Sequence, residues 1–306
     1  MRLGVFVAPQ VGATYEDQLA VATLAEALGF VAFVRSDHYL AAPGQTALPG
    51  PTDAWITLAG LARETSTIRL GTMVSPVTFR LPGPLAVAVA QVDVMSGGRV
   101  SLGLGAGWYE AEHQAYGIPF PSRVERFERL EEQLQVVRGL WTTPLGVPFD
   151  FEGRWYSLRG SPALPKPAQR PHPPIVVGGA GLSRTPLLAA RHADELNVSP
   201  TRSPEAAAAM FARGRAACEA VGRDPASLRC SVMPTTVCGT SRADVRRRLA
   251  HPGVGTPELV GTPDDVVEQL EAYAAAGADL AYLRLVDLRD LDHLALLGDA
   301  VLPRLA

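Results

Sequence analysis

An aspartate and a histidine adjoin in the segment Arg35-Ser36-Asp37-His38, directly after an apolar run at 30–34. Histidine titrates near neutrality, so His38 could donate or accept a proton, and a neighbouring carboxylate such as Asp37 could orient its ring. The same dipeptide could equally serve as a surface or capping element. We therefore treat Asp37 and His38 as candidate catalytic residues, and the residues around them will decide whether they have that role.

Three further segments place small residues where a backbone could approach a ligand closely. They are GTMVSP at 71–76, LGLGAGWYE at 102–110 and GGAGL at 178–182. The alternate glycines of the second segment resemble a dinucleotide fingerprint, but the third glycine comes one place early and Trp108 stands in its slot, so we reject that motif. The third segment opens a helix, whose N-terminal N–H groups could bind phosphate without a lysine, although a simple tight turn would look the same.

Metal, serine-nucleophile and lysine chemistry find little support. The histidines show neither His-x-His nor His-Glu-x-x-His spacing, so a zinc hydrolase has no ligand set and we expect no metal. No Gly-x-Ser-x-Gly elbow occurs. The one lysine, Lys166, lies in a proline-rich stretch, which disfavours a Schiff base or a P-loop. Cys218, Cys230 and Cys238 are too few and too unevenly spaced for a disulfide framework, so we expect buried thiols in a reducing compartment.

Composition narrows the class of protein. The chain has 306 residues, of which 47% are hydrophobic, with 28 Lys and Arg against 31 Asp and Glu and a formal charge of −3. Such a balance without basic runs disfavours a nucleic-acid partner. No stretch reaches the roughly 18 apolar residues of a membrane span, and the N-terminus does not resemble a signal peptide. We expect a cytoplasmic protein without a membrane or nucleic-acid partner.

Eight short apolar runs alternate with helix-period segments from one end of the chain to the other. The expected strands are 3–8, 30–34, 68–74, 100–104, 174–177, 195–198, 228–237 and 280–286. The expected helices are 13–29, 53–65, 82–96, 123–141, 183–192, 204–221, 263–277 and 291–302. This order predicts an α/β fold, a (β/α)₈ TIM barrel in one domain at 1–306, with an open doubly wound sheet as the alternative.

Two insertions interrupt the alternation, at about 144–174 and 251–262. The first holds eight of the 26 prolines and a predicted hairpin at 149–156. Active sites of such barrels lie at the carboxyl ends of the strands, so the candidate residues, each of which follows a strand, should converge there. We expect the loop at 39–52 and both insertions to decide which substrate enters.

Taken together, these segments resemble the luciferase-like monooxygenase superfamily, and within it the branch that uses the deazaflavin coenzyme F420. The matching motifs are SDH at 36–38, LGTMVSP at 70–76, SGGRVSLGLG at 96–105, LGLGAGWYEAEHQAYGIPF at 102–120, RFERLEEQLQVVRGLW at 126–141, PPIVVGGAG at 173–181, AARHADELN at 189–197 and VGTPDDVVEQLEAYAAAGAD at 260–279. The resemblance runs nearly from end to end. It implies that F420, or alternatively FMN, is held at the carboxyl ends of the barrel strands.

The resemblance also implies roles for individual residues. The loop of Thr72, Met73 and Val74 would back the cofactor ring through a cis peptide between Met73 and Val74, and Ala106 and Gly107 would contact the ring or its ribityl chain. The phosphate cradle would comprise Gly178, Gly179, Ala180, Gly181 and Leu182. His38, with Asp37, matches the position that handles protons near the reactive ring carbon.

One departure from the pattern concerns the substrate. Sugar-phosphate dehydrogenases of the superfamily carry a catalytic glutamate where this chain has Trp108, so we do not expect glucose-6-phosphate oxidation. Trp108, Tyr109 and His113 are the expected substrate pocket, and an aromatic wall predicts a less polar substrate. Glu110 could act as an acid or base, or it could be a charge at a helix N-terminus.

Several functions are compatible with these residues. The first is an oxidoreductase that passes hydride between F420 and a small organic substrate while His38 handles the proton. The second is a monooxygenase that takes FMNH2 from a separate reductase. A barrel that binds a flavin without turnover comes third, and a metal-dependent hydrolase is disfavoured. We expect a homodimer, the commonest oligomer.

Overall fold

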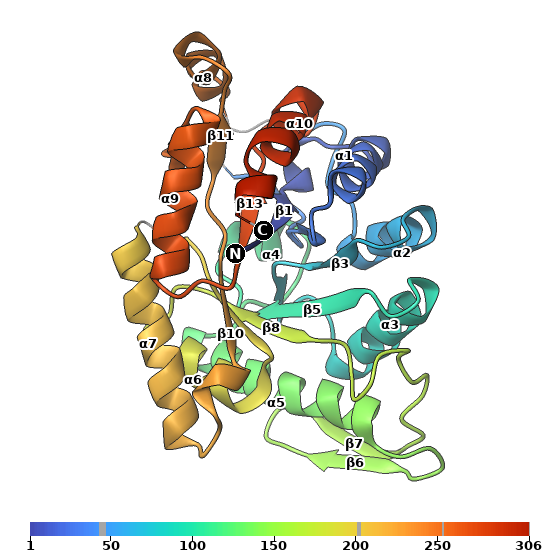
Figure 1. Ribbon diagram of the computed structural model, residues 1–306. Helices are drawn as coiled ribbons and strands as arrows, with labels where there is room; N and C mark the ends of the chain where they lie inside the picture. Colours follow the sequence, from blue (N-terminus) through green and yellow to red (C-terminus); the bar gives the residue numbers. More distant parts are fainter. Residues whose placement is uncertain (43–46, 201–202, 253, 306) are drawn as a thin grey trace.

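Eight parallel strands form a closed barrel in the computed structural model, which describes residues 1–42, 47–200, 203–252 and 254–305 (Figure 1). The strands are β1 (Arg2–Val7), β2 (Ala32–Arg35), β3 (Arg69–Thr72), β5 (Val100–Gly105), β8 (Ile175–Gly178), β9 (Glu195–Val198), β10 (Arg229–Val232) and β13 (Leu280–Arg284). Each strand pairs with the next along the chain, and β1 pairs with β13 to complete the ring. The predicted (β/α)₈ barrel is confirmed and the open sheet is excluded.

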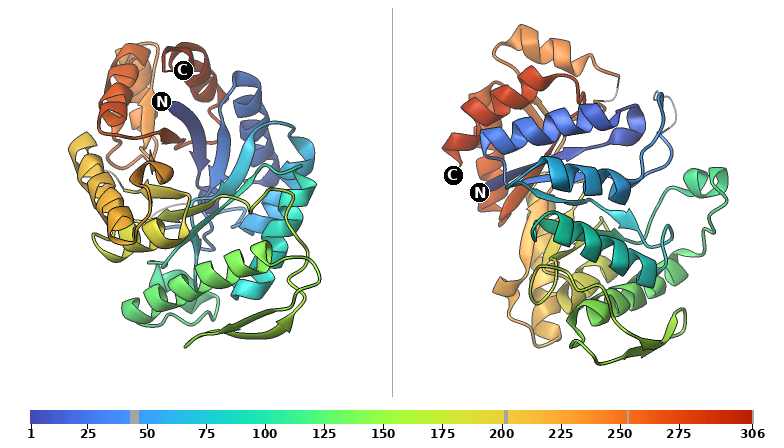
Figure 2. Two further views of the ribbon diagram at one scale, coloured as in Figure 1. Left: turned by 60° about the horizontal axis from the view of Figure 1, so that its bottom comes forward. Right: turned by 90° about the vertical axis from the view of Figure 1, so that its right-hand side faces the viewer.

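Helices surround the barrel and connect its strands (Figure 2). They are α1 (Tyr15–Leu28), α2 (Ala54–Glu64), α3 (Pro82–Met95), α5 (Arg123–Thr142), α6 (Arg184–His192), α7 (Pro204–Ala220), α9 (Pro263–Ala275) and α10 (Leu291–Ala300). Their starts follow from capping residues: Thr14 and Asp17 form a capping box at α1, and the Asp53 carboxylate accepts two N–H groups at α2. No helix in the described part of the chain is long and apolar enough to cross a membrane.

Two predicted strands are divided, each for a local reason. The run at 228–237 contains Pro234, which has no N–H to donate, so β10 ends at Val232 and β11 (Thr236–Cys238) begins a separate sheet with β12 (Leu259–Gly261). The run at 68–74 ends at Thr72, before a cis peptide between Met73 and Val74, and β4 (Ser75–Pro76) follows. The resemblance implied this cis peptide, and it is present.

The side chains of the strands alternate between two cores. Phe6, Val34, Val176 and Tyr282 belong to a cluster inside the barrel, whereas their sequence neighbours pack against the helices. Buried Glu195 also faces the interior, where it accepts hydrogen bonds from Ser231 Oγ at 2.6 Å and Tyr282 Oη at 3.0 Å. Burial raises the pKa of Glu195. Along each strand, every second side chain therefore faces the barrel interior, and those between face the helices.

The insertion at 144–174 lies away from the expected site. It joins the carboxyl end of α5 to the amino end of β8, and such connections lie at the opposite end of the barrel from the catalytic face. Its hairpin, β6 (Phe149–Glu152) and β7 (Ser157–Ser161), packs on the outer side of α5 (Figure 1), where Glu132 accepts three N–H groups of the turn. Our expectation that this insertion shapes the substrate site is therefore wrong.

The lysine is hydrogen-bonded to the backbone, and the three cysteines are buried. Lys166 Nζ donates to the Leu140 carbonyl oxygen at 2.7 Å. The three cysteines are buried free thiols, as predicted, and burial raises the pKa of Cys230 to about 12 and that of Cys238 to about 11. None of them is poised as a thiolate.

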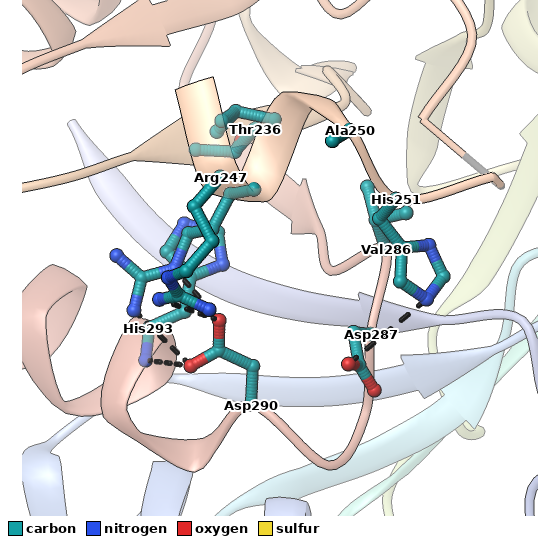
Figure 3. A pocket seen from close by; sticks show the side chains of 10 residues that line it. Thr236, Arg247, Ala250, His251, Val286, Asp287, Asp290 and His293 are labelled. Atoms are coloured by element: carbon teal, nitrogen blue, oxygen red, sulfur yellow. Dashed lines mark hydrogen bonds and ion pairs between the residues drawn. The ribbon is translucent and has the colours of Figure 1, made fainter. Parts of the chain in front are cut away.

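A polar cavity of about 190 Å³ lies beside α8 (Arg242–Leu249), and His251, the first residue of the second insertion, is among the residues that line it (Figure 3). Arg248 Nε donates to Asp290 at 2.7 Å, and its Nη1 donates to Asp244 at 2.6 Å and to the Cys238 carbonyl oxygen at 2.9 Å. His293 Nε2 lies 3.0 Å from the Cys238 N–H and accepts its hydrogen bond. An imidazole that accepts at Nε2 must be unprotonated there, so the contact requires neutral His293.

Stability should therefore depend on the charge of His293. Burial lowers the pKa of His293 from 6.5 to about 4. Between these values the unfolded chain binds a proton that the folded protein does not, so this stabilisation is complete above pH 6.5 and is lost as the pH falls toward 4. We predict that the free energy of unfolding loses up to about 3 kcal/mol from this group over that range, measured by urea denaturation.

The variant His293→Gln keeps an acceptor for Cys238 but cannot titrate, so its unfolding free energy should fall less steeply over the same pH range. An unchanged slope in His293→Gln would contradict the assignment.

Candidate active site

A histidine and a buried glutamate meet where β2 and β5 end. His38 Nδ1 lies 3.0 Å from both carboxylate oxygens of Glu112, which is 1% exposed and also accepts the Tyr39 N–H at 3.2 Å. Because a carboxylate can only accept, Nδ1 carries the hydrogen and Nε2 remains to take or give a proton. Sequence reasoning missed Glu112, which lies on α4 (Glu110–Ala115), a short helix outside the eight whose ranges were predicted.

Asp37 has a different role from the one we expected. Its carboxylate is fully buried and accepts hydrogen bonds from Ser75 Oγ at 2.6 Å and Arg80 Nη1 at 2.5 Å. The prediction that Asp37 orients the His38 ring is therefore wrong, because the His38 ring is hydrogen-bonded to Glu112 and not to Asp37. Asp37 ties the loop after β2 to the loop after β3 and thereby fixes the backbone that carries His38.

Arg80 connects Asp37 to Asp53, which lies at the start of α2. Its Nη2 lies 2.5 Å from Asp53 Oδ2, and the Tyr39 hydroxyl donates to the same oxygen at 3.1 Å. Burial alone would lower the pKa of Arg80, but Asp37 and Asp53 outweigh it and raise that pKa. Burial raises the pKa of Tyr39 to about 12. The cluster therefore joins the Arg80 guanidinium to the carboxyl groups of Asp37 and Asp53 and to the Tyr39 phenol, and Arg80 was not among the predicted residues.

The predicted aromatic wall stands next to His38. Trp108 is 69% exposed, and its ring lies edge-on to the His38 ring with the centroids 5.9 Å apart. It stacks on Tyr109 at 5.0 Å, and the Tyr109 hydroxyl donates to the Ala41 carbonyl oxygen at 3.0 Å. Trp108 and Tyr109 thus form an aromatic face beside His38.

Neither His113 nor Glu110 belongs to the aromatic face that Trp108 and Tyr109 form beside His38. His113 is fully buried, with Nδ1 2.7 Å from the Tyr109 carbonyl oxygen and Nε2 2.6 Å from Thr78 Oγ1. It therefore supports the aromatic wall from behind and does not line an opening. Glu110 is exposed at the first position of α4 and accepts a hydrogen bond from Gln114 at 3.3 Å. This placement favours its interpretation as a charge at a helix terminus.

Val74 explains the alternate glycines of β5. A Cβ atom at Gly105 would lie 2.7 Å from Val74 Cγ2, one at Gly178 would lie 2.8 Å from Val74 Cγ1, and one at Gly103 would lie 2.1 Å from the Thr72 carbonyl oxygen. Thr72 and Met73 are buried, whereas Val74 is partly exposed. The glycines therefore make room for the loop of Thr72, Met73 and Val74. Our interpretation that they let a ligand approach the β5 backbone is wrong for Gly103 and Gly105.

The turn after β8 is the expected phosphate cradle, and glycines determine its backbone geometry. Gly179 has a φ of +146°, and a Cβ at Gly181 would lie 2.6 Å from Thr185 Oγ1, so side chains are unfavourable at both positions. Ser183, before α6, makes no capping hydrogen bond with its side chain. Ala180 and Leu182 are exposed. Backbone N–H groups at the start of α6 are thus free of side-chain caps, which suits a phosphate group.

Two arginines stand near this turn. Arg184, the first residue of α6, donates to the Val124 carbonyl oxygen at 3.2 Å, and its guanidinium lies 5.8 Å from the centre of the Phe127 ring. Arg123 lies 6.0 Å from the same ring. Both add positive charge beside the cradle, and neither was predicted. Ala106 and Gly107, the expected ring contacts, are partly exposed where β5 ends.

Packing of Val74 against the glycines should be measurable. We predict that Gly105→Ala lowers the free energy of unfolding by about 1–3 kcal/mol, because the new methyl group overlaps Val74. Urea denaturation of both single variants and of the Gly105→Ala, Val74→Ala double variant would give a positive coupling between the sites. Gly83→Ala, where a Cβ meets nothing within 4 Å, is the control and should not destabilise the protein. Additive effects at Gly105 and Val74 would contradict the packing.

Comparison with known proteins adds to this geometry. A family model described as luciferase-like monooxygenase matches residues 1–257. An F420-dependent hydroxymycolic acid dehydrogenase of Mycobacterium tuberculosis is 32% identical over 275 residues, which cover 85% of this chain and 72% of that protein. An FMNH(2)-dependent dimethylsulfone monooxygenase of Pseudomonas putida is 37% identical over 105 residues, or 33% of this chain and 28% of that protein.

Solved structures share the fold. An F420-dependent secondary alcohol dehydrogenase, solved in complex with an F420-acetone adduct, superimposes with a TM-score of 0.85 at 18% identity, covering 100% of this chain and 99% of that chain. At this level of identity the likeness concerns the barrel alone.

Proposed function

The chain belongs to the luciferase-like monooxygenase family, and on that premise we propose that it is an F420-dependent oxidoreductase whose His38 handles the proton. The observation that carries the proposal is the pair of His38 and Glu112 at the barrel mouth, next to the Trp108 wall. Relatives that depend on F420 and on FMNH2 support a deazaflavin or flavin cofactor for the family.

The residues present fit such a cofactor. The turn at Gly178 to Leu182 would hold its phosphate through backbone N–H groups, with Arg184 and Arg123 supplying positive charge. The partly exposed residues Val74, Ala106 and Gly107 would contact its ring. When bound, F420 supplies a ring carbon that gives or accepts a hydride.

His38 performs the proton transfer that must accompany hydride transfer at a carbon–oxygen or similar bond. In the oxidising direction its Nε2 takes the proton of the substrate hydroxyl, and in the reducing direction it returns that proton. Glu112 holds Nδ1–H and stabilises the imidazolium that forms. Trp108 and Tyr109 provide an apolar face that excludes water, which favours a substrate with a hydrophobic portion.

A second candidate is an FMNH2-dependent monooxygenase. The likeness to the dimethylsulfone monooxygenase favours it, because the same barrel and phosphate turn could hold reduced FMN. An enzyme that consumes FMNH2 needs a source of reduced flavin, so this candidate implies a separate reductase as partner. Hydride transfer with F420 needs no FMN, so the cofactor that the protein binds separates the two candidates in the test below.

We also propose that the protein is a homodimer. Helices α2 and α3 pack together and expose apolar side chains, with Ile56 77%, Val87 42% and Val94 55% exposed. Apolar groups exposed on adjacent helices commonly mark an interface between subunits.

The proposal predicts cofactor affinity and turnover separately. Calorimetric titration should show micromolar binding of F420, and a screen of enones, imines and quinones with reduced F420 should reveal a substrate. His38→Ala should then lower turnover by about 10²- to 10⁴-fold while F420 affinity is preserved, because His38 acts on the proton and not on the phosphate. Glu112→Gln should lower turnover by about 10- to 100-fold.

Glu110→Gln, two residues from Glu112 on the same helix, is the matched control and should keep wild-type turnover. Binding of FMN without binding of F420 would overturn the proposal in favour of the monooxygenase. Full turnover in His38→Ala would remove its assigned role.

A further inference from the structure

Arg284 points into the barrel from the last position of β13. It is paired with Phe6 of β1 in the parallel sheet and with Thr235 through an isolated bridge. Paired residues of parallel strands direct their side chains to the same face, and both Phe6 and Tyr282 belong to the interior cluster. Arg284 therefore faces the interior at the carboxyl end of the barrel, the same end as His38.

Arg284 has no partner in direct contact with its charge in the described part of the chain. Its guanidinium offers five donors, yet it makes no side-chain hydrogen bond and no ion pair with any described residue. Other buried arginines are held firmly: Arg35 donates to Gln18, Ser36 and Thr52, and Arg80 pairs with two carboxylates. Burial lowers the pKa of Arg284, so its surroundings oppose the charge that it must carry.

Nearby groups do not neutralise it. Glu258 is the carboxylate whose charge acts on Arg284, but it forms no ion pair with it, and its Oε2 accepts the Thr235 N–H at 2.7 Å. The inward neighbours Phe6 and Met233 are apolar. A partly buried cation with free donors among apolar side chains is suited to an anionic ligand.

The phosphate cradle lies elsewhere in the mouth. It follows β8, and β9 and β10 separate that strand from β13. In the ring of eight strands, Arg284 is therefore three strands away from the cradle, whereas β2, which leads to His38, is two strands away on the other side, through β1. An anion at Arg284 would be a different group from the phosphate at Gly178 to Leu182.

We propose that Arg284, with Thr235 on the same inward face, binds a carboxylate or phosphate group of the substrate. This inference rests on the proposed function and names its substrate class, a molecule with an apolar body and an anionic end. The guanidinium would hold that end so that the reactive bond reaches His38, while Trp108 and Tyr109 cover the apolar part. Glutamine or methionine at 284 would leave the cofactor site intact.

Inorganic phosphate is the probe, and thermal unfolding of the full chain is the readout, with and without saturating F420. With the cradle occupied by F420, phosphate should still raise the melting temperature of the wild type saturably. Arg284→Met should weaken this phosphate affinity at least about tenfold, and Arg284→Lys, which keeps the charge, should lose less. Arg213→Met, an exposed arginine on α7 with the same change in net charge, should match the wild type.

Three results would overturn the inference. The first is a saturable phosphate effect in Arg284→Met equal to that of the wild type, and the second is the absence of any saturable effect in the wild type. The third is loss of F420 affinity in Arg284→Met, which would assign Arg284 to the cofactor and not to the substrate. Because the phosphate effect is also measured without F420, failure of the chain to bind F420 would refute the proposed function while Arg284 is still tested.

Discussion

Two carboxylates buried at the barrel mouth, Asp37 and Glu112, set the arrangement of the site. Removing a carboxylate from water costs several kcal/mol unless a partner compensates it. Asp37 is compensated by Arg80 and Ser75, and Glu112 by His38 and the Tyr39 N–H. These partners come from different loops, so satisfying both charges forces the loops after β2, β3 and β5 into one arrangement. His38 gains its orientation from this constraint.

The backbone beneath that site obeys a second constraint, which is steric. Val74 occupies the space that side chains at Gly105 and Gly178 would fill, so the loop after β3 and the ends of β5 and β8 fit only together. The cradle begins at Gly178, and the aromatic wall begins two residues after Ala106. The expected ring, phosphate and substrate contacts are therefore built on one rigid set of strand ends, as precise positioning of reacting groups requires.

Sequence reasoning found the barrel because its signal is local and repeated: each strand is a short apolar run and each helix has its own period. It also singled out His38 and the glycine turn by residue type, and their roles stay predictions. It missed Glu112 and Arg80, because their importance comes from burial and from partners 74 and 43 residues away. Asp37 was misassigned for the same reason, since adjacency in sequence sends neighbouring side chains in different directions.

Topology explains the other differences. The insertion at 144–174 was expected near the substrate because it is long and rich in proline, but it connects a helix end to a strand start and so lies at the wrong end of the barrel. The alternate glycines of β5 suggested a ligand, whereas their neighbour is Val74. Composition records which residues are small and cannot record what fills the space beside them.

The central claim is that Glu112 fixes His38 with hydrogen on Nδ1, so that Nε2 exchanges the proton at the barrel mouth. Nitrogen-15 NMR of histidine-labelled protein tests it directly, with the His38 signals assigned by their loss in His38→Gln. The account predicts that neutral His38 is protonated at Nδ1, and that Glu112→Gln yields a mixture of tautomers. A neutral His38 that carries its hydrogen on Nε2 in the wild type would contradict it.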